Sequence, residues 1–258
     1  MRQALGLLWQ FALRDLAGRY RGTLIGFGWV FVTPLLLLLV FTFVFNGVFN
    51  MKWPHSDWDS PLGFALFTFC GLLLHQALAD TMARSPGLIL SQPNLVTKVI
   101  LPLWVLPASI LGAIIFQLLV GLGVFLIVLA IVNGVHTSWI TLPLLLVPFS
   151  LGLLGVALSL AALGVYLRDI NQIIGLVIVL LMFLSPIFYP LSAVPEDMRF
   201  WLNLNPMAAL METLRTTLIL GEWPGARFIL LAWLLGGLFA LTGIGVFRHL
   251  KRGFADVL

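Results

Sequence analysis

Charged residues are scarce in this sequence of 258 residues: Asp, Glu, Lys and Arg together make up only 9% of it. A soluble domain carries about 25% charged residues. Because 61% of the chain is hydrophobic, too few charges remain to cover a water-facing surface, and lipid must cover much of it. Membrane helices need about 20 residues each. The chain therefore holds only a handful of them with their loops, and no large domain outside the membrane.

Several chemical signatures are also missing. The single cysteine, Cys70, allows no disulfide within the chain. The sequence contains no G-x-x-x-x-G-K-S/T segment, which excludes ATP binding by a P-loop. It has no H-E-x-x-H segment, cysteine pair or histidine cluster that would favour a metal. The net charge of +4 is not gathered in a basic stripe, which argues against nucleic acid. We therefore expect neither a metal nor a cofactor in this chain.

Six long apolar runs predict an all-α, polytopic membrane protein with about six transmembrane helices. The runs are residues 24–49, 62–82, 101–132, 139–166, 173–189 and 228–247. The third run is longer than one bilayer needs, and its Pro102 and Pro107 predict a bent start.

Two further segments are helical but do not span. Residues 4–19 carry apolar side chains at helical spacing and polar ones on another face, which predicts an amphipathic helix in the membrane interface. Residues 190–224 are too polar to cross lipid freely, and predict broken external helices that dip into the membrane edge against protein or a wet cavity. Within them, Asn205 and Pro206 fit an N-cap and first helical residue, and Gly221 fits a helix stop.

Two pairs of opposite charge are spaced for helical ion pairs. Glu212 and Arg215 lie one turn apart, on a face separate from the apolar face of their helix. Asp80 precedes Arg84 by four residues, and we interpret the two as a structural ion pair near the cytoplasmic end of span two. A chain of acidic residues across the midplane, which a proton-coupled transporter would need, is absent.

Charge asymmetry between the loops orients the chain. Ten Lys and Arg residues fall on the side of the termini, and four fall on the other side together with most of the carboxylates. Because positive charge marks cytoplasmic loops, we expect both termini in the cytoplasm. The ten are Arg2, Arg14, Arg19, Arg21, Arg84, Lys98, Arg168, Arg248, Lys251 and Arg252.

One face of span one is aromatic when the helix is projected at about 100° per residue. It consists of Phe27, Phe31, Thr42, Phe45, Asn46 and Phe49. Aromatic rings give contact area without fixed hydrogen bonds, and Thr and Asn supply exchangeable ones, which suits a lumen that slides sugar rings past it. Ordinary helix packing, in which phenylalanine is common, is the alternative.

Four segments resemble a known family, and their order and spacing cover essentially the whole chain. They are FALRDLAGRYRGTLIGFGWVFVTPLLLLLVFTFVF, SQPNLVTKVILPLWVLP, RDINQIIGLVIVLLMFLSPIFYPLSAVP and NPMAALMETLRTTLILGEWP. The chain resembles ABC-2-type permeases that export polysaccharides such as O-antigen, teichoic acid and capsule. The resemblance implies a single transmembrane domain over residues 1–258 in the bacterial inner membrane.

The resemblance also implies partners. Such permeases work as homodimers with two copies of a separate ABC ATPase, which binds ATP and Mg and grips the N-terminal helix and the cytoplasmic loop 84–98. The substrate is a lipid-linked glycan on an undecaprenyl carrier. The expected docking residues, on a short helix in this loop, are Leu90, Ser91, Gln92 and Asn94. The expected pathway lies at the dimer interface between spans one and five, which adds Phe188 and Tyr189 to the aromatic face.

Three arginines lie where a carrier pyrophosphate would arrive. Arg14, Arg19 and Arg21 offer cationic side chains that suit phosphate, although positive-inside anchoring is the interpretation that we favour for them. Two other functions stay open. A membrane enzyme acting on lipid-linked sugars would need catalytic groups clustered at one face, whereas the carboxylates here are dispersed. An ABC-2 exporter of small molecules is the third reading. The motifs do not specify the glycan.

Overall fold

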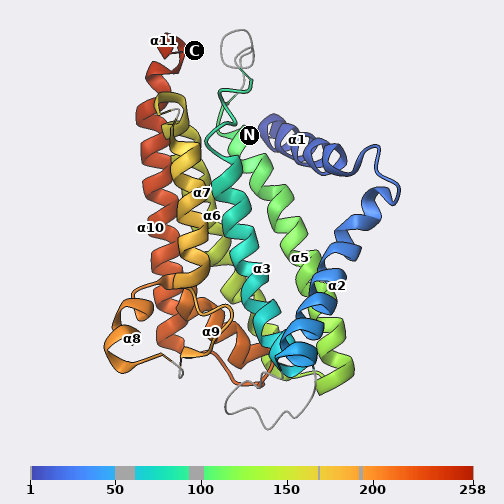
Figure 1. The fold of residues 1–258 in the computed structure, drawn as a ribbon. Coiled ribbons are helices and arrows are strands. Elements are labelled where there is room, and N and C mark those ends of the chain that lie inside the picture. The colour runs from blue at the N-terminus through green and yellow to red at the C-terminus, as the bar shows by residue number, and fades with distance from the viewer. Residues whose placement is uncertain (1, 50–61, 93–101, 168, 192–193, 258) are drawn as a thin grey trace.

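A computed structural model describes residues 2–49, 62–92, 102–167, 169–191 and 194–257. In these ranges every regular element is a helix, which confirms the predicted fold class (Figure 1). Five helices are long and apolar enough to cross a membrane, and a shorter apolar helix adds to them. The five are Gly26–Phe45, Gly63–Arg84, Val105–Asn133, Thr137–Tyr166 and Ala226–Gly253.

Helix α1 (Arg2–Tyr20) lies across the bundle at the end where α5 (Val105–Asn133) begins (Figure 1). Its Ala12 and Leu16 are buried, and Ala12 packs against the backbone of Gly112 on α5. Trp9, which the helical spacing groups with them, is 65% exposed. Protein therefore covers only part of the apolar face of α1, and the Trp9 side chain is left exposed.

The first span is irregular at both ends. It starts with a 3-10 turn (Gly26–Gly28), continues as α2 (Trp29–Phe41) and ends as a seven-residue π-helix, η2 (Thr42–Val48). A π-helix turns less per residue than an α-helix, and such segments are rare and common at functional sites. The projection at a constant 100° therefore fails beyond Thr42.

Helix α3 (Gly63–Arg84) is the most buried span and forms the centre of the molecule. It contacts α5 and α9 (Pro206–Leu218), and its side chains from Phe64 to Cys70 are all buried. The core is thus built around the second span, whereas α2 and α10 (Ala226–Leu250) present much of their surface outward.

Helices α6 (Leu142–Tyr166) and α10 cross in close contact. A Cβ added at Gly243 would lie 2.3 Å from the carbonyl oxygen of Gly155, and one at Gly236 would lie 2.2 Å from that of Pro148. Small residues at such a crossing let two membrane helices approach backbone to backbone. The close contact of α6 and α10 therefore depends on glycines, because any side chain at these positions would clash with the facing backbone.

The fifth apolar segment departs from its predicted bounds. Helix α7 spans Ile170–Leu184, so it begins before residue 173 and ends before Tyr189. Ser185 is extended (ψ 140°), as a residue before proline prefers, and Pro186 ends the helix. At 1.5 Å per residue α7 is about 22 Å long, shorter than the ~30 Å hydrocarbon layer.

Two short helices follow α7 at the end of the bundle opposite the C-terminal helix α11 (Phe254–Val257): α8 (Glu196–Asn203) and α9 (Pro206–Leu218) (Figure 1). The predicted N-cap is confirmed, because the Asn205 side chain accepts a hydrogen bond from the Met207 N–H. Gly221 has φ +76°, a left-handed conformation that suits a helix stop.

Candidate functional site

The C-terminal half of span one meets the segment after α7 in a group of aromatic rings. Phe45 is central: its ring centroid lies 4.9 Å from that of Phe64 and 6.0 Å from that of Phe188. Phe41 stacks on Phe45 at 5.7 Å, and Phe49 lies 6.4 Å away from it. The structure therefore brings three predicted pathway residues, Phe45, Phe49 and Phe188, into one packed group. We name these five residues the aromatic cluster.

The other predicted pathway residues lie apart from this cluster. Phe31 is 48% exposed, as is Phe27, whose ring lies 5.9 Å from that of Phe116 on α5. The Thr42 hydroxyl donates to the Leu38 carbonyl within its own helix, and the Tyr189 hydroxyl donates to that of Phe183. The side chain of Asn46 lies outside the described residues. Within one chain, the predicted face is therefore two separate patches.

An ion network ties α1 to α3 at the end of the bundle where α1 lies. Arg84 donates a close hydrogen bond to the carboxylate of Asp15. The Arg19 guanidinium lies 3.7 Å from the Asp80 carboxylate and 3.8 Å from that of Asp15. It also donates to the Gln117 side chain on α5 at 2.5 Å. The predicted pairing of Asp80 with Arg84 is wrong, because both residues pair with α1.

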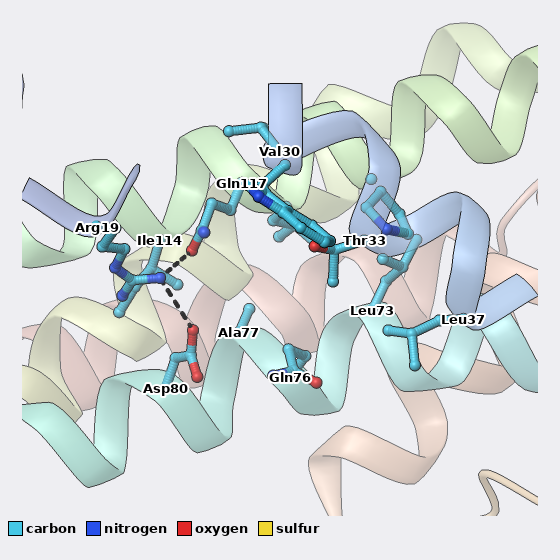
Figure 2. A pocket seen from close by; sticks show the side chains of 14 residues that line it. Arg19, Val30, Thr33, Leu37, Leu73, Gln76, Ala77, Asp80, Ile114 and Gln117 are labelled. Carbon is cyan, nitrogen blue, oxygen red and sulfur yellow. Dashed lines mark hydrogen bonds and ion pairs between the residues drawn. The ribbon is translucent and has the colours of Figure 1, made fainter. Parts of the chain in front are cut away.

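A cavity of about 330 Å³ lies beside this network, between α2, α3 and α5. Figure 2 shows Thr33 and Leu37 entering it from α2, Gln76 and Asp80 from α3, and Arg19 spanning the gap to Asp80 and Gln117. We name it the polar cavity. Its remaining lining is mostly apolar: Trp29, Val30, Pro34, Leu73, Ala77, Ile114, Leu118 and Gly121.

A second hollow, about 760 Å³, separates α1 from the turn that follows α3, residues 85–92. Two predicted docking residues, Ser91 and Gln92, line it opposite Arg14. Residues 85–92 form tight hydrogen-bonded turns, and the remainder of the loop 84–98, in which a short helix is expected, lies outside the described residues. Ile89 is fully buried, and Leu90 is half-buried.

This turn is held firmly against the bundle. A Cβ at Gly164 on α6 would lie 2.1 Å from the Pro86 carbonyl oxygen. Of the other candidates, Asn94 lies outside the described residues, whereas Arg14 and Arg21 are exposed. Arg19 is half-buried and balanced by two carboxylates. The three arginines are therefore not equivalent as phosphate ligands, since of the three Arg14 and Arg21 are exposed and Arg19 is paired with carboxylates.

Arg215 on α9 is buried, although its spacing in the sequence predicts a position away from the apolar face of its helix. It is 0% exposed, so its expected position on a separate polar face is wrong. Its guanidinium donates to the carbonyl oxygens of Phe67 (2.8 Å), Pro186 (2.6 Å) and Ile187 (2.9 Å). One side chain thus satisfies the backbone freed where α7 ends, which must be satisfied away from water.

Gly71 makes room for this arginine, and Glu212 pairs with it. A Cβ at Gly71 would lie 2.7 Å from its guanidinium, so a larger residue there would displace it. Glu212 lies 3.6 Å from it and is partly exposed. Burial lowers the pKa of Arg215 below its ordinary value, and the Glu212 carboxylate acts in the opposite direction. The sequence signal for this site was the α7 break at Pro186, whose open carbonyls require a donor.

No group of three His, Cys, Asp or Glu side chains in the described ranges could hold a metal ion. The described side chains gather instead as aromatic rings, ion pairs and the polar groups of the two hollows.

Comparison with known proteins agrees with this architecture. The profile of the family described as "ABC-2 type transporter" matches residues 6–219. The O-antigen export system permease protein RfbA of Myxococcus xanthus is 28% identical over 97% of this chain and 95% of its own length. A protein of the same name from Klebsiella pneumoniae is 24% identical over 100% of this chain and 98% of its own length.

Proposed function

The chain belongs to the ABC-2 type transporter family, and from that premise we propose that it is the membrane permease subunit of an ATP-driven polysaccharide exporter. Its cargo is a lipid-linked, O-antigen-like glycan on an undecaprenyl carrier, moved across the bacterial inner membrane. The observation that carries this proposal is the full-length similarity to two proteins named as O-antigen export permeases.

The arrangement of the molecule supports transport over catalysis. Its polar groups lie on facing helices in the polar cavity, and its aromatic rings gather where span one meets the end of α7. Weak, equivalent contacts suit the passage of a long chain better than one deep binding well, because a deep well would stall transport.

The power for transport comes from other chains in this proposal. Two copies of a separate ABC ATPase bind ATP and Mg and act on a homodimer of this chain. The cytoplasmic turn offers a place for the ATPase to push, because it is packed on α6 through Gly164 and faces α1 across the second hollow. Both termini lie in the cytoplasm, as positive charge favours.

Deletion of the gene in its host tests the proposal. The deletion strain should lose long-chain glycan from its surface and accumulate undecaprenyl-linked glycan inside, and the intact gene should restore the wild-type state. A deletion strain with an unchanged surface glycan, or one that stops making the glycan altogether, would contradict an export function. The second result would indicate the rival membrane enzyme.

A further inference from the structure

The polar cavity has a lining that lipid alone would not favour. Gln76 precedes the Arg84 end of α3 by eight residues, which is about 12 Å along the helix and therefore inside the ~30 Å hydrocarbon layer. Its side chain is nonetheless exposed, and Thr33 and Gln117 line the same cavity. Polar groups at this depth are costly and mark pathways for substrates or ions.

The charges of the cavity balance. Arg19 and Asp80 both line it, 3.7 Å apart, and Asp15, 3.8 Å from the same guanidinium, is paired in turn with Arg84. An anion entering the cavity would meet the Asp80 carboxylate beside Arg19, and a cation would meet the arginine. The occupant that fits is uncharged and makes many hydrogen bonds.

The side chains that line the cavity further limit the chemical class of molecule that could bind there. Amide side chains both donate and accept, as a hydroxyl does, and Gln76 supplies one, whereas the Gln117 oxygen accepts from Arg19. Trp29 and aliphatic side chains form the remaining wall, and an indole offers a large apolar face. A volume of about 330 Å³ is at the lower end of ligand pockets, which run from about 300 to 1,000 Å³. A sugar ring, with apolar faces and a hydroxyl rim, has this combination.

We propose that the polar cavity is a subsite for one neutral sugar unit of the transported glycan, an inference that rests on the proposed export function. Trp29 and Leu73 contact the C–H face of the ring, while Gln76 and Thr33 bond to its hydroxyls. The Arg19–Asp80 pair adds charge-assisted hydrogen bonds without adding net charge. Because α2 continues from Thr33 to Phe41, a sugar leaving the cavity along this helix meets the aromatic cluster next.

Photocrosslinking in the export-competent host tests the subsite. A benzophenone amino acid replaces Leu37, which lines the cavity, or Leu39 on the same helix, which is 64% exposed and does not line it. We expect the probe at residue 37 alone to yield adducts that contain sugar by mass spectrometry. Ile114 offers a second cavity position should the first variant fail to accumulate in the membrane.

A second measurement uses export itself. Replacing Gln76 by Leu removes a hydrogen-bonding side chain and should lower surface glycan about two- to tenfold at unchanged membrane abundance. The matched control is Thr242→Val, an exposed polar residue on α10, which should export normally.

The outcomes separate the subsite from the export function. Three crosslinking results would overturn the subsite. The first is adducts with phospholipid or bare carrier phosphate, and the second is equal adducts from residues 37 and 39. The third is the absence of adducts from residues 37 and 114 while glycan export proceeds. Normal export by Gln76→Leu would also overturn it. If the intact chain itself fails to restore surface glycan to the deletion strain, the export function is wrong and the subsite falls with it.

Discussion

Arg215 offers the most direct test of how the end of the bundle that carries α8 and α9 is held together. The substitution Arg215→Met keeps much of the apolar stem and removes the three hydrogen bonds to Phe67, Pro186 and Ile187. Pro186 and Ile187 lie beyond the last residue of α7, so their carbonyls lose the hydrogen bonds that the guanidinium donates to them. Each buried polar group left unsatisfied costs about 1–3 kcal/mol.

The expected loss of stability follows from these contacts. Two orphaned carbonyls and the lost third bond give about 3–6 kcal/mol, in line with the cost of breaking a buried charged contact. Glu212 is partly exposed, so its lost partner adds little. Arg215→Lys keeps the charge but lacks the planar fork that reaches three acceptors, and we expect an intermediate loss.

Thermal unfolding of the purified protein in mild detergent measures this effect. About 2–4 °C per kcal/mol predicts a midpoint lowered by at least about 6 °C for Arg215→Met. The matched control is Arg227→Met, because Arg227 is exposed on α10, and it should shift the midpoint little. Equal midpoints for the two methionine variants would refute the reasoning that Arg215 holds the end of α7.

The close crossing of α6 and α10 predicts that Gly243→Val, whose Cβ would meet the Gly155 carbonyl at 2.3 Å, lowers membrane abundance, whereas Gly237→Val, with nothing within 4 Å, does not; equal abundance would contradict it. Asp15→Asn removes pairs with Arg19 and Arg84 and should cost about 1 kcal/mol. Arg84→Gln in that background should then add less than it does alone, and full additivity by thermal unfolding would count against the network. Asp197→Cys should react with an impermeant maleimide in spheroplasts and Arg252→Cys should not, over a low background because Cys70 is buried; the reverse pattern would invert the orientation. Phe45→Ala should destabilise the chain by about 3 kcal/mol through lost packing on Phe64 and Phe188, and normal abundance with normal surface glycan would contradict both this packing and a role of the aromatic cluster in passage.

The helices could be predicted from the sequence because long apolar runs and cap residues act locally. Five of the six runs correspond to helices of spanning length, and the N-cap at Asn205 follows from the side-chain chemistry of one turn. The end of α7 at Leu184 could also be predicted from the sequence, because Pro186 disfavours a helical conformation of the residue before it. The apolar residues beyond it nevertheless extended the predicted span to residue 189.

The site depends on contacts that sequence spacing does not contain. The spacing of Asp80 and Arg84 fits a helical pair, but α1 supplies Asp15 and Arg19 as competing partners from a distant part of the chain. The π-helix at Thr42–Val48 changes the angle per residue, so a regular projection misplaces the side chains beyond its first residue. Arg215 looked like a polar surface residue because its acceptors are backbone carbonyls, which carry no residue identity.

Reconstitution of ATP-driven transport tests the central claim most directly. Inverted membrane vesicles carrying this chain and its cognate ABC ATPase are supplied with undecaprenyl-linked glycan on the outer, formerly cytoplasmic, face. The account predicts that Mg-ATP moves the glycan into the lumen, where a glycan-cleaving enzyme cannot reach it, and that vesicles lacking this chain or holding a P-loop variant of the ATPase leave it accessible. Equal protection of the glycan without this chain would contradict the claim that this permease carries it.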